Sequence, residues 1–235
     1  MTTASNFAPN PAAQSKQLQH ALVYFAAYVI LGLILSIVGP TLPGLAGQAG
    51  STLSQISVIF AGNSLGIVTG SLLGGWLFDR YRGHPILIAA LAALSILLFT
   101  LPLLPSRWLV SSVFLLIGIS IGILDVGGNT LIVWLFGRQV GPYMNALHLS
   151  FGVGALLSPM LADRIMIATG GIRWVYWTLA ILVLPVIIWL MRKTSPVRPI
   201  DETESSEDSP QRSYSLLILM ISALFFMHVG TELGF

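Results

Sequence analysis

The sequence predicts an all-α membrane protein whose helices cross the bilayer several times. Hydrophobic residues make up 55% of the 235 residues and charged residues only 9%, whereas a soluble domain is about 25% charged. The few charges are clustered, which leaves several apolar runs of about 20 residues, the length that spans a hydrocarbon core as a helix. The composition therefore indicates a multi-pass membrane protein rather than a soluble domain.

Composition also excludes several kinds of chemistry. The chain contains no cysteine, so disulfides, thiolate catalysis and Cys-based metal sites are absent, and we expect no cofactor and no resident metal. The net charge of +2 comes from basic residues scattered over loops, which does not indicate a nucleic acid as a partner. The lipid bilayer is the partner that the composition predicts.

The apolar runs divide the chain into a tail, a bundle, a linker and a last helix. Residues 1–17 are polar and Pro-containing, which predicts a disordered cytoplasmic tail. A six-helix bundle is predicted over 18–193, with helices at 18–39, 52–78, 85–103, 108–136, 142–162 and 174–191. The uncharged segment at 39–51 is interpreted as a turn. Acidic, Pro- and Ser-rich residues predict a cytoplasmic linker at 194–213, and 214–235 begins a seventh helix that is truncated.

Lysine and arginine positions predict the orientation of the bundle. With the N-terminus in the cytoplasm, eight of these residues lie inside and three outside, as the positive-inside rule prefers. We expect the protein in a plasma membrane or a bacterial inner membrane. Six helices, a charged linker and a seventh helix are the layout of a transporter with two six-helix halves. The chain is therefore expected to be a fragment that lacks the C-terminal half.

The bundle contains an internal echo. Leu77–Arg80 and Leu161–Arg164 both close with Asp-Arg, at an offset of 84 residues, and the same offset places Gly70 on Gly154. The two Asp-Arg pairs are predicted on opposite sides of the membrane, as inverted three-helix repeats would place them. Gly66, Gly70 and Gly74 recur at every fourth residue, a spacing that lets membrane helices pack closely.

Asp125 is the one acid near the middle of the fourth predicted helix. A carboxylate at bilayer depth costs roughly 2.5–3.5 kcal/mol, so a cavity, a partner, a proton or a ligand must offset it. Asn129 shares its helix face, four residues later. Burial favours the protonated form of a carboxylate, which makes Asp125 a candidate proton carrier. If it stays ionised, it could hold Na+ together with Asn129. The alternative is a hydrogen bond that only packs two helices.

Other polar side chains of the predicted helices are candidates for the same cavity: Asn63 in the second, His148 in the fifth and Glu232 in the seventh. His148 could instead satisfy a neighbouring backbone carbonyl. Tyr24 and Tyr28 form an aromatic stripe in the first helix, which we interpret as packing more than as sugar stacking.

One motif suggests an enzyme by its letters alone. Gly62–Gly66 reads G-N-S-L-G, which matches the nucleophile elbow of hydrolases. That motif requires a strand, a sharp turn and a helix, whereas these residues lie inside an apolar helix. We therefore predict no enzymatic activity.

The loop after the second helix carries a family resemblance. The run from Gly75 to Gly83 reads G-W-L-F-D-R-Y-R-G, and it resembles the signature loop of the major facilitator superfamily. In that family the acid of this loop contacts a helix of the other half and latches one conformation. The resemblance implies that Gly75, Asp79, Arg80 and Gly83 form a gating loop.

Further stretches are similar to the sodium-dependent glucose transporter-like branch of that superfamily, a relative of the fucose–proton symporters. They include Leu124–Asn129, Asn145–Ala155 and Val229–Phe235. In the fucose symporter group, a helix 4 acid followed four residues on by Asn lies in the central cavity and takes part in proton coupling. Asp125 and Asn129 occupy those positions. A second acid, in helix 1 of that group, has no counterpart within 18–39, so the coupling ion stays open between H+ and Na+.

The resemblance implies a secondary active transporter of a small polar solute, a sugar, that works by alternating access. Asp125, Asn129, His148, Glu232 and Asn63 would contact the substrate or the coupling ion. The sequence has no P-loop, so ATP is not the expected energy source. Two other interpretations remain open: a seven-helix receptor or sensor, and a truncated product that does not transport.

Overall fold

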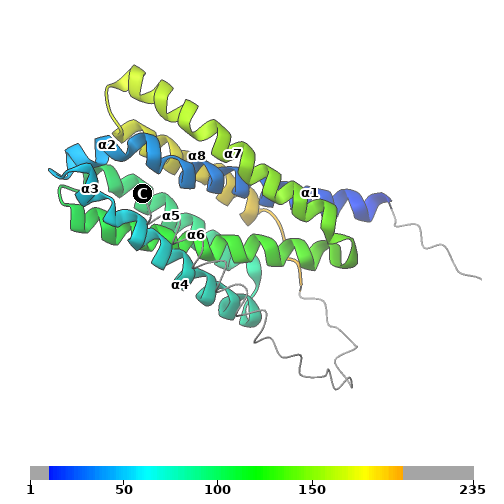
Figure 1. The fold of residues 1–235 in the computed structure, drawn as a ribbon. Helices are drawn as coiled ribbons and strands as arrows, with labels where there is room; N and C mark the ends of the chain where they lie inside the picture. The colour runs from blue at the N-terminus through cyan, green and yellow to red at the C-terminus, as the bar shows by residue number, and fades with distance from the viewer. Residues whose placement is uncertain (1–10, 198–235) are drawn as a thin grey trace, which may run out of the picture. The chain divides into compact units, whose positions relative to one another are not determined.

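The computed structural model describes residues 11–197, with side chains from residue 17 onward (Figure 1). Its helices are α1 (Pro11–Ser36), α2 (Val38–Gln48), α3 (Leu53–Ile56), α4 (Val58–Arg80), α5 (Gly83–Thr100), η1 (Leu101–Leu103), α6 (Arg107–Phe136), η2 (Gly137–Gln139), α7 (Val140–Thr169) and α8 (Arg173–Met191). This part of the chain contains no strand, and the predicted all-α fold is confirmed.

The six long helices correspond to the six predicted spans. By length and composition, five stretches of the described residues can cross a membrane, and one of them, residues 107–169, contains both α6 and α7. The helices lie side by side in Figure 1. The letters G-N-S-L-G fall inside α4, as expected for a helix rather than a nucleophile elbow. The predicted seventh helix, with Glu232, lies outside the described residues.

Three boundaries differ from the sequence prediction. α1 already begins at Pro11, so residues 11–17 are helical although a disordered tail was expected there. The segment interpreted as a turn forms α2, with Pro40 in its first turn, where a missing N–H breaks no helical hydrogen bond, and Pro43 inside the helix. α7 continues to Thr169 instead of ending at 162. It ends at Gly170, whose φ of +75° gives the left-handed cap that favours glycine.

Two close helix crossings hold the bundle together. α4 packs against α6, where a Cβ added to Gly122 would collide with the backbone of Ile67 and Ser71. α1 packs against α7, where a Cβ added to Gly32 would collide with the backbone of Phe151 and Ala155. In membranes, helices associate through such small residues because no hydrophobic effect drives them together.

The two crossings are equivalent. Ile67 and Ser71 lie 84 residues before Phe151 and Ala155, the offset that relates the two Asp-Arg pairs. The glycines Gly70 and Gly154 are also 84 residues apart, and they meet the backbones of Ile119 and Val29. On that second side of the crossings the offset is 90 residues, from Val29 to Ile119 as from Gly32 to Gly122. α1, α4 and α5 thus repeat as α6, α7 and α8. Each long helix runs antiparallel to the one before it, so the fourth long helix runs opposite to the first. The two halves of this repeat therefore cross the membrane in opposite directions.

The helices differ in how many of their apolar side chains are buried. The buried apolar side chains come mainly from α1, α5, α6 and α8, whereas α4 buries chiefly its glycines. Large apolar side chains on α4 and α7 stay exposed, among them Leu72 and Leu156, each 74% exposed. Outward apolar faces of this size suit a helix surface that meets lipid or a further helix.

Candidate functional site

A hydrogen-bonded cluster joins α1 to α6 around Asp125. The Tyr28 hydroxyl donates to the Asp125 backbone oxygen at 2.8 Å and to its carboxylate Oδ1 at 3.0 Å. The Asn129 amide Nδ2 donates to the Tyr28 hydroxyl oxygen at 3.0 Å, to the Asp125 backbone oxygen at 2.9 Å and to Oδ1 at 3.4 Å. The sequence predicted that Asp125 and Asn129 share a face, and the structure adds Tyr28 as the residue that bridges them.

The cluster uses only one carboxylate oxygen of Asp125. Among residues 17–197, no hydrogen bond reaches the second oxygen, Oδ2. Asp125 is partly buried, whereas Tyr28 is 2% exposed. The carboxylate therefore has one fixed edge and one edge that is open to a cation or a hydroxyl group.

Two adjacent glycines let α6 approach its neighbours beside this acid. A Cβ on Gly128 would collide with the Tyr28 ring, so the absence of a side chain creates the space in which that ring lies. A Cβ on Gly127 would collide with Phe78 and Leu87, on α4 and α5. The Gly-Gly pair after Asp125 thus admits α1 on one side and α4 with α5 on the other.

His148 brings a third helix to the cluster. Its ring lies edge-on to the Tyr28 ring, with the centroids 6.1 Å apart and the planes at 71°. The side chain is exposed, so its nitrogens remain accessible to a ligand. The structure places the His148 ring against Tyr28, whose hydroxyl bonds to Asp125 and Asn129, and it shows no hydrogen bond of His148 with those two residues among the described side chains.

Asn63 lies apart from this cluster. Its amide oxygen is buried without a hydrogen-bond partner, beside a cavity of about 10 Å³ that Ile37, Phe114 and Tyr176 help to line. That volume is about what one water molecule needs. Asn63 is therefore separate from the Asp125 cluster in this structure.

The predicted gating loop lies at the junction of α4 and α5. Asp79 and Arg80 are exposed in the last turn of α4, where the Arg80 guanidinium lies 4.6 Å from the centroid of the Trp76 ring. Gly83 opens α5 and is buried against Phe78 and Leu131. Gly75 has open space where a Cβ would be, so packing does not explain a glycine there.

His84 connects three segments of the chain, and these contacts were not predicted from the sequence. It is 3% exposed, and its ring nitrogens lie 2.7 Å from the Tyr24 hydroxyl and 3.0 Å from the Lys193 backbone oxygen. The ring joins the start of α5 to α1 and to the segment after α8. Tyr24 and Tyr28, predicted as one packing stripe, therefore have different polar partners. The i,i+4 spacing of the tyrosines was the available signal, but it does not identify those partners.

Comparisons with known proteins match this arrangement. The model of the Major Facilitator Superfamily matches residues 24–234. Sodium-dependent glucose transporter 1 of Homo sapiens is 40% identical over 137 residues, which cover 58% of this chain and 26% of that protein. Sodium-dependent glucose transporter 1A of Mus musculus is 29% identical over 248 residues, which cover 90% of this chain and 58% of that protein.

The name of a third relative states no substrate. Major facilitator superfamily domain-containing protein 4A of Homo sapiens is 33% identical over 150 residues, which cover 63% of this chain and 29% of that protein. In these three matches the chain spans between 26% and 58% of the relative's length.

Proposed function

Because this chain belongs to the Major Facilitator Superfamily, in its sodium-dependent glucose transporter-like branch, we propose that it forms part of a secondary transporter for a sugar. The observation that carries the proposal is Asp125. It is a carboxylate within a membrane-spanning helix, with Oδ1 held by Tyr28 and Asn129 and Oδ2 open. Acids at such depth are expensive, and they mark substrate and ion pathways.

The chemistry of the cluster suits a polyhydroxyl solute and a hard cation. Sugar hydroxyls both donate and accept hydrogen bonds, and Asp125, Asn129 and His148 offer both kinds of partner. The exposed ring of His148, which lies edge-on to the buried Tyr28 ring, adds an aromatic surface. The word sodium in the relatives' names favours Na+ over H+ as the coupling ion, with Oδ2 of Asp125 as its ligand.

We propose that transport requires a second six-helix half, against which this unit rocks to expose the cluster to either side in turn. The chain's partial coverage of its relatives supports this, as does the exposure of His148. Glu232 and Asn63 are further proposed contacts of the substrate or the ion. Asp79 and Arg80, with Gly75 and Gly83, would form the latch between the halves. The N-terminus is proposed to lie in the cytoplasm, and the described unit alone would not transport.

The test is uptake of labelled glucose by proteoliposomes that contain the full-length protein, with an inward Na+ gradient or an inward pH gradient. We expect the Na+ gradient to drive accumulation, and we expect Asp125→Asn to reduce the Na+-driven rate by at least about tenfold, the factor that 1.4 kcal/mol of lost interaction gives. Asp163→Asn is the matched control, because Asp163 is an exposed acid of α7 outside the cluster.

The outcomes separate the parts of the proposal. Accumulation driven only by the pH gradient would replace Na+ with H+ as the coupling ion. If Asp125→Asn took up glucose at the wild-type rate, Asp125 would not be part of the coupling site. If a panel of hexoses and pentoses showed no uptake above that of empty vesicles under either gradient, the sugar transport proposal itself would be rejected.

A further inference from the structure

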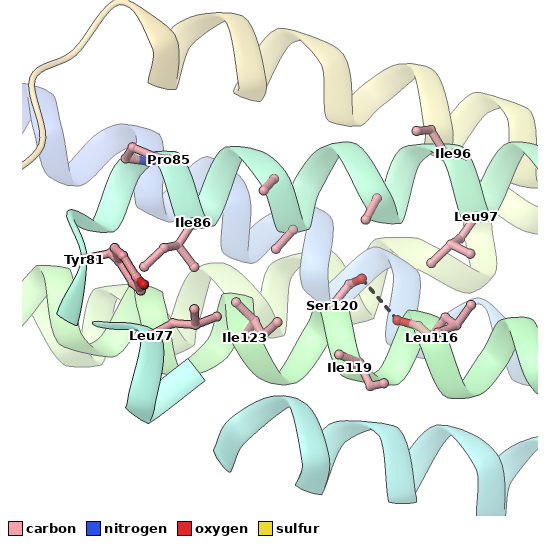
Figure 2. A pocket seen from close by; sticks show the side chains of 13 residues that line it. Leu77, Tyr81, Pro85, Ile86, Ile96, Leu97, Leu116, Ile119, Ser120 and Ile123 are labelled. Carbon is pink, nitrogen blue, oxygen red and sulfur yellow. Dashed lines mark hydrogen bonds between the residues drawn. The ribbon is translucent and has the colours of Figure 1, made fainter. Parts of the chain in front are cut away.

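A long apolar groove lies between α4, α5 and α6 (Figure 2), and its lining includes no residue of the Asp125 cluster. Its volume is about 760 Å³, within the range of about 300–1,000 Å³ typical of ligand sites. Short side chains of α5, Ala89 and Ala93 among them, hollow it out between the larger residues of α5 and α6. Its lining has two hydroxyl groups, on Tyr81 and Ser120, and the Ser120 hydroxyl already donates to the Leu116 backbone oxygen at 3.1 Å.

The groove is somewhat longer than one leaflet of a bilayer is thick. Its lining residues on α5 run from Pro85 to Leu97, a rise of about 18 Å at 1.5 Å per residue. Half of a hydrocarbon core is about 15 Å thick. Tyr81 and Pro85 lie at the α4–α5 junction, so that end of the groove meets the headgroup region, and the other end, at Leu97, lies past the middle of the span Gly83–Leu103.

The concave, apolar wall of the groove suits an acyl chain. A flexible chain inside a concave wall also gains more dispersion contacts than it would on a convex helix surface.

Positive charge gathers at the headgroup end. Arg82 follows Tyr81 and lines a second hollow of about 220 Å³, which shares Pro85 with the groove and is also lined by Lys193. A third hollow, which shares Tyr81 with the groove and Arg82 with the second hollow, is lined by Asp79 and Arg80. The first turn of α5 adds the positive end of a helix macrodipole. The linings at this end thus hold three cations, Arg80, Arg82 and Lys193, against one acid, and this positive excess complements an anionic headgroup.

We propose that this groove binds one acyl chain of an anionic phospholipid, whose headgroup lies against Arg82 and Lys193. The lipid belongs to the leaflet that meets the Tyr81 end. The site does not depend on which solute is transported, because it shares no residue with the Asp125 cluster. A lipid there would fill the space between α5 and α6 beside the gating loop, and so stabilise the junction of α4 with α5.

The experiment is native mass spectrometry of the protein released from detergent that contains equal amounts of phosphatidylglycerol and phosphatidylcholine with identical acyl chains. We expect retained phosphatidylglycerol to exceed phosphatidylcholine by about fivefold, the factor that one Arg near an anionic surface contributes. Arg82→Gln should remove most of that preference. Arg138→Gln, an exposed arginine that lines none of these hollows, should keep it.

Filling the groove tests the acyl chain separately. Ala93→Leu should reduce retention of both lipids several-fold without an internal clash, because Ala93 is exposed in the groove. Ala61→Leu, at an exposed alanine of α4 outside the groove, should retain them as wild type does. Unchanged thermal denaturation would show that both variants are folded.

Three results would overturn the proposal. Equal retention of the two lipids in the wild type would show that the site does not select an anionic headgroup. If Ala93→Leu retained the lipids as the wild type does, the groove would not be the binding site. A protein dimer that Ala93→Leu dissociates, with no lipid bound, would identify a second copy of the chain as the occupant instead.

Discussion

At the scale of single residues, the Tyr28 ring can occupy its position only because residue 128 is a glycine and has no side chain. A Cβ at Gly128 would collide with its ring, so we expect Gly128→Ala to displace Tyr28 from Asp125 and Asn129. Overpacking of this kind costs about 1–3 kcal/mol, which should lower the melting temperature of the purified protein by about 3–10 °C. Intrinsic tryptophan fluorescence during heating is the measurement.

Gly152→Ala is the control for Gly128→Ala. Gly152 is a helical glycine with open space where the Cβ would lie, so alanine there should be neutral or should gain up to about 1 kcal/mol of helix propensity. An equal melting temperature for Gly128→Ala and wild type would contradict the role of Gly128 as the space for Tyr28.

The polar pair was predictable at this scale, and its partner was not. Asp125 and Asn129 are four residues apart on one helix, so their shared face follows from helical geometry alone. The contact with Tyr28 depends on where α1 crosses α6, which no local pattern encodes. Tyr24 and Tyr28 illustrate the limit, because two tyrosines of one stripe bond to His84 and to Asp125.

At the scale of helices, the equivalence of the two crossings makes a quantitative prediction. Gly32→Ala separates α1 from α7, and Gly122→Ala separates α6 from α4. Because their surroundings correspond, we expect the two substitutions to destabilise by similar amounts, about 1–3 kcal/mol each. The crossings share no contact residue, so the double variant should show the sum within about 0.5 kcal/mol. Melting temperatures of the single and double variants measure this.

Gly75→Ala serves as the control on α4, since open space surrounds that position. A neutral Gly32→Ala beside a destabilising Gly122→Ala would contradict the equivalence of the crossings. Strong coupling between the two substitutions would indicate instead that the helix pairs move as one body.

Helix positions were largely predictable because about 20 consecutive apolar residues have few alternatives in a bilayer. The differences lie where local signals compete. Pro40 and Pro43 suggested a turn, but α2 accommodates them, and Gly44 packs its backbone against Ile172. Asp163 suggested the end of a span, whereas the left-handed Gly170 sets the end of α7.

At the scale of the whole molecule, charge separates the two ends of the described bundle. The α4–α5 junction, the α6–α7 junction and the end of α8 lie at one end, because successive long helices run in opposite directions. The lysines and arginines of residues 17–197 divide accordingly, five at this end and three at the other: Arg80, Arg82, Arg138, Arg192 and Lys193, against Arg107, Arg164 and Arg173. The positive-inside rule therefore assigns the end with Arg82 to the cytoplasm.

Residues 1–235 contain no cysteine, so a thiol introduced among them reports on its own position, measured against the same protein without that thiol. We expect Pro105→Cys, at the end with Arg107, to react with a membrane-impermeant maleimide in intact cells. Gln139→Cys, next to Arg138, should react only after the membrane is permeabilised. Both positions are exposed, Pro105 between η1 and α6 and Gln139 at the end of η2, so burial should not limit either reaction. Labelling of Gln139→Cys alone in intact cells would invert the orientation, and it would move the anionic lipid site to the outer leaflet.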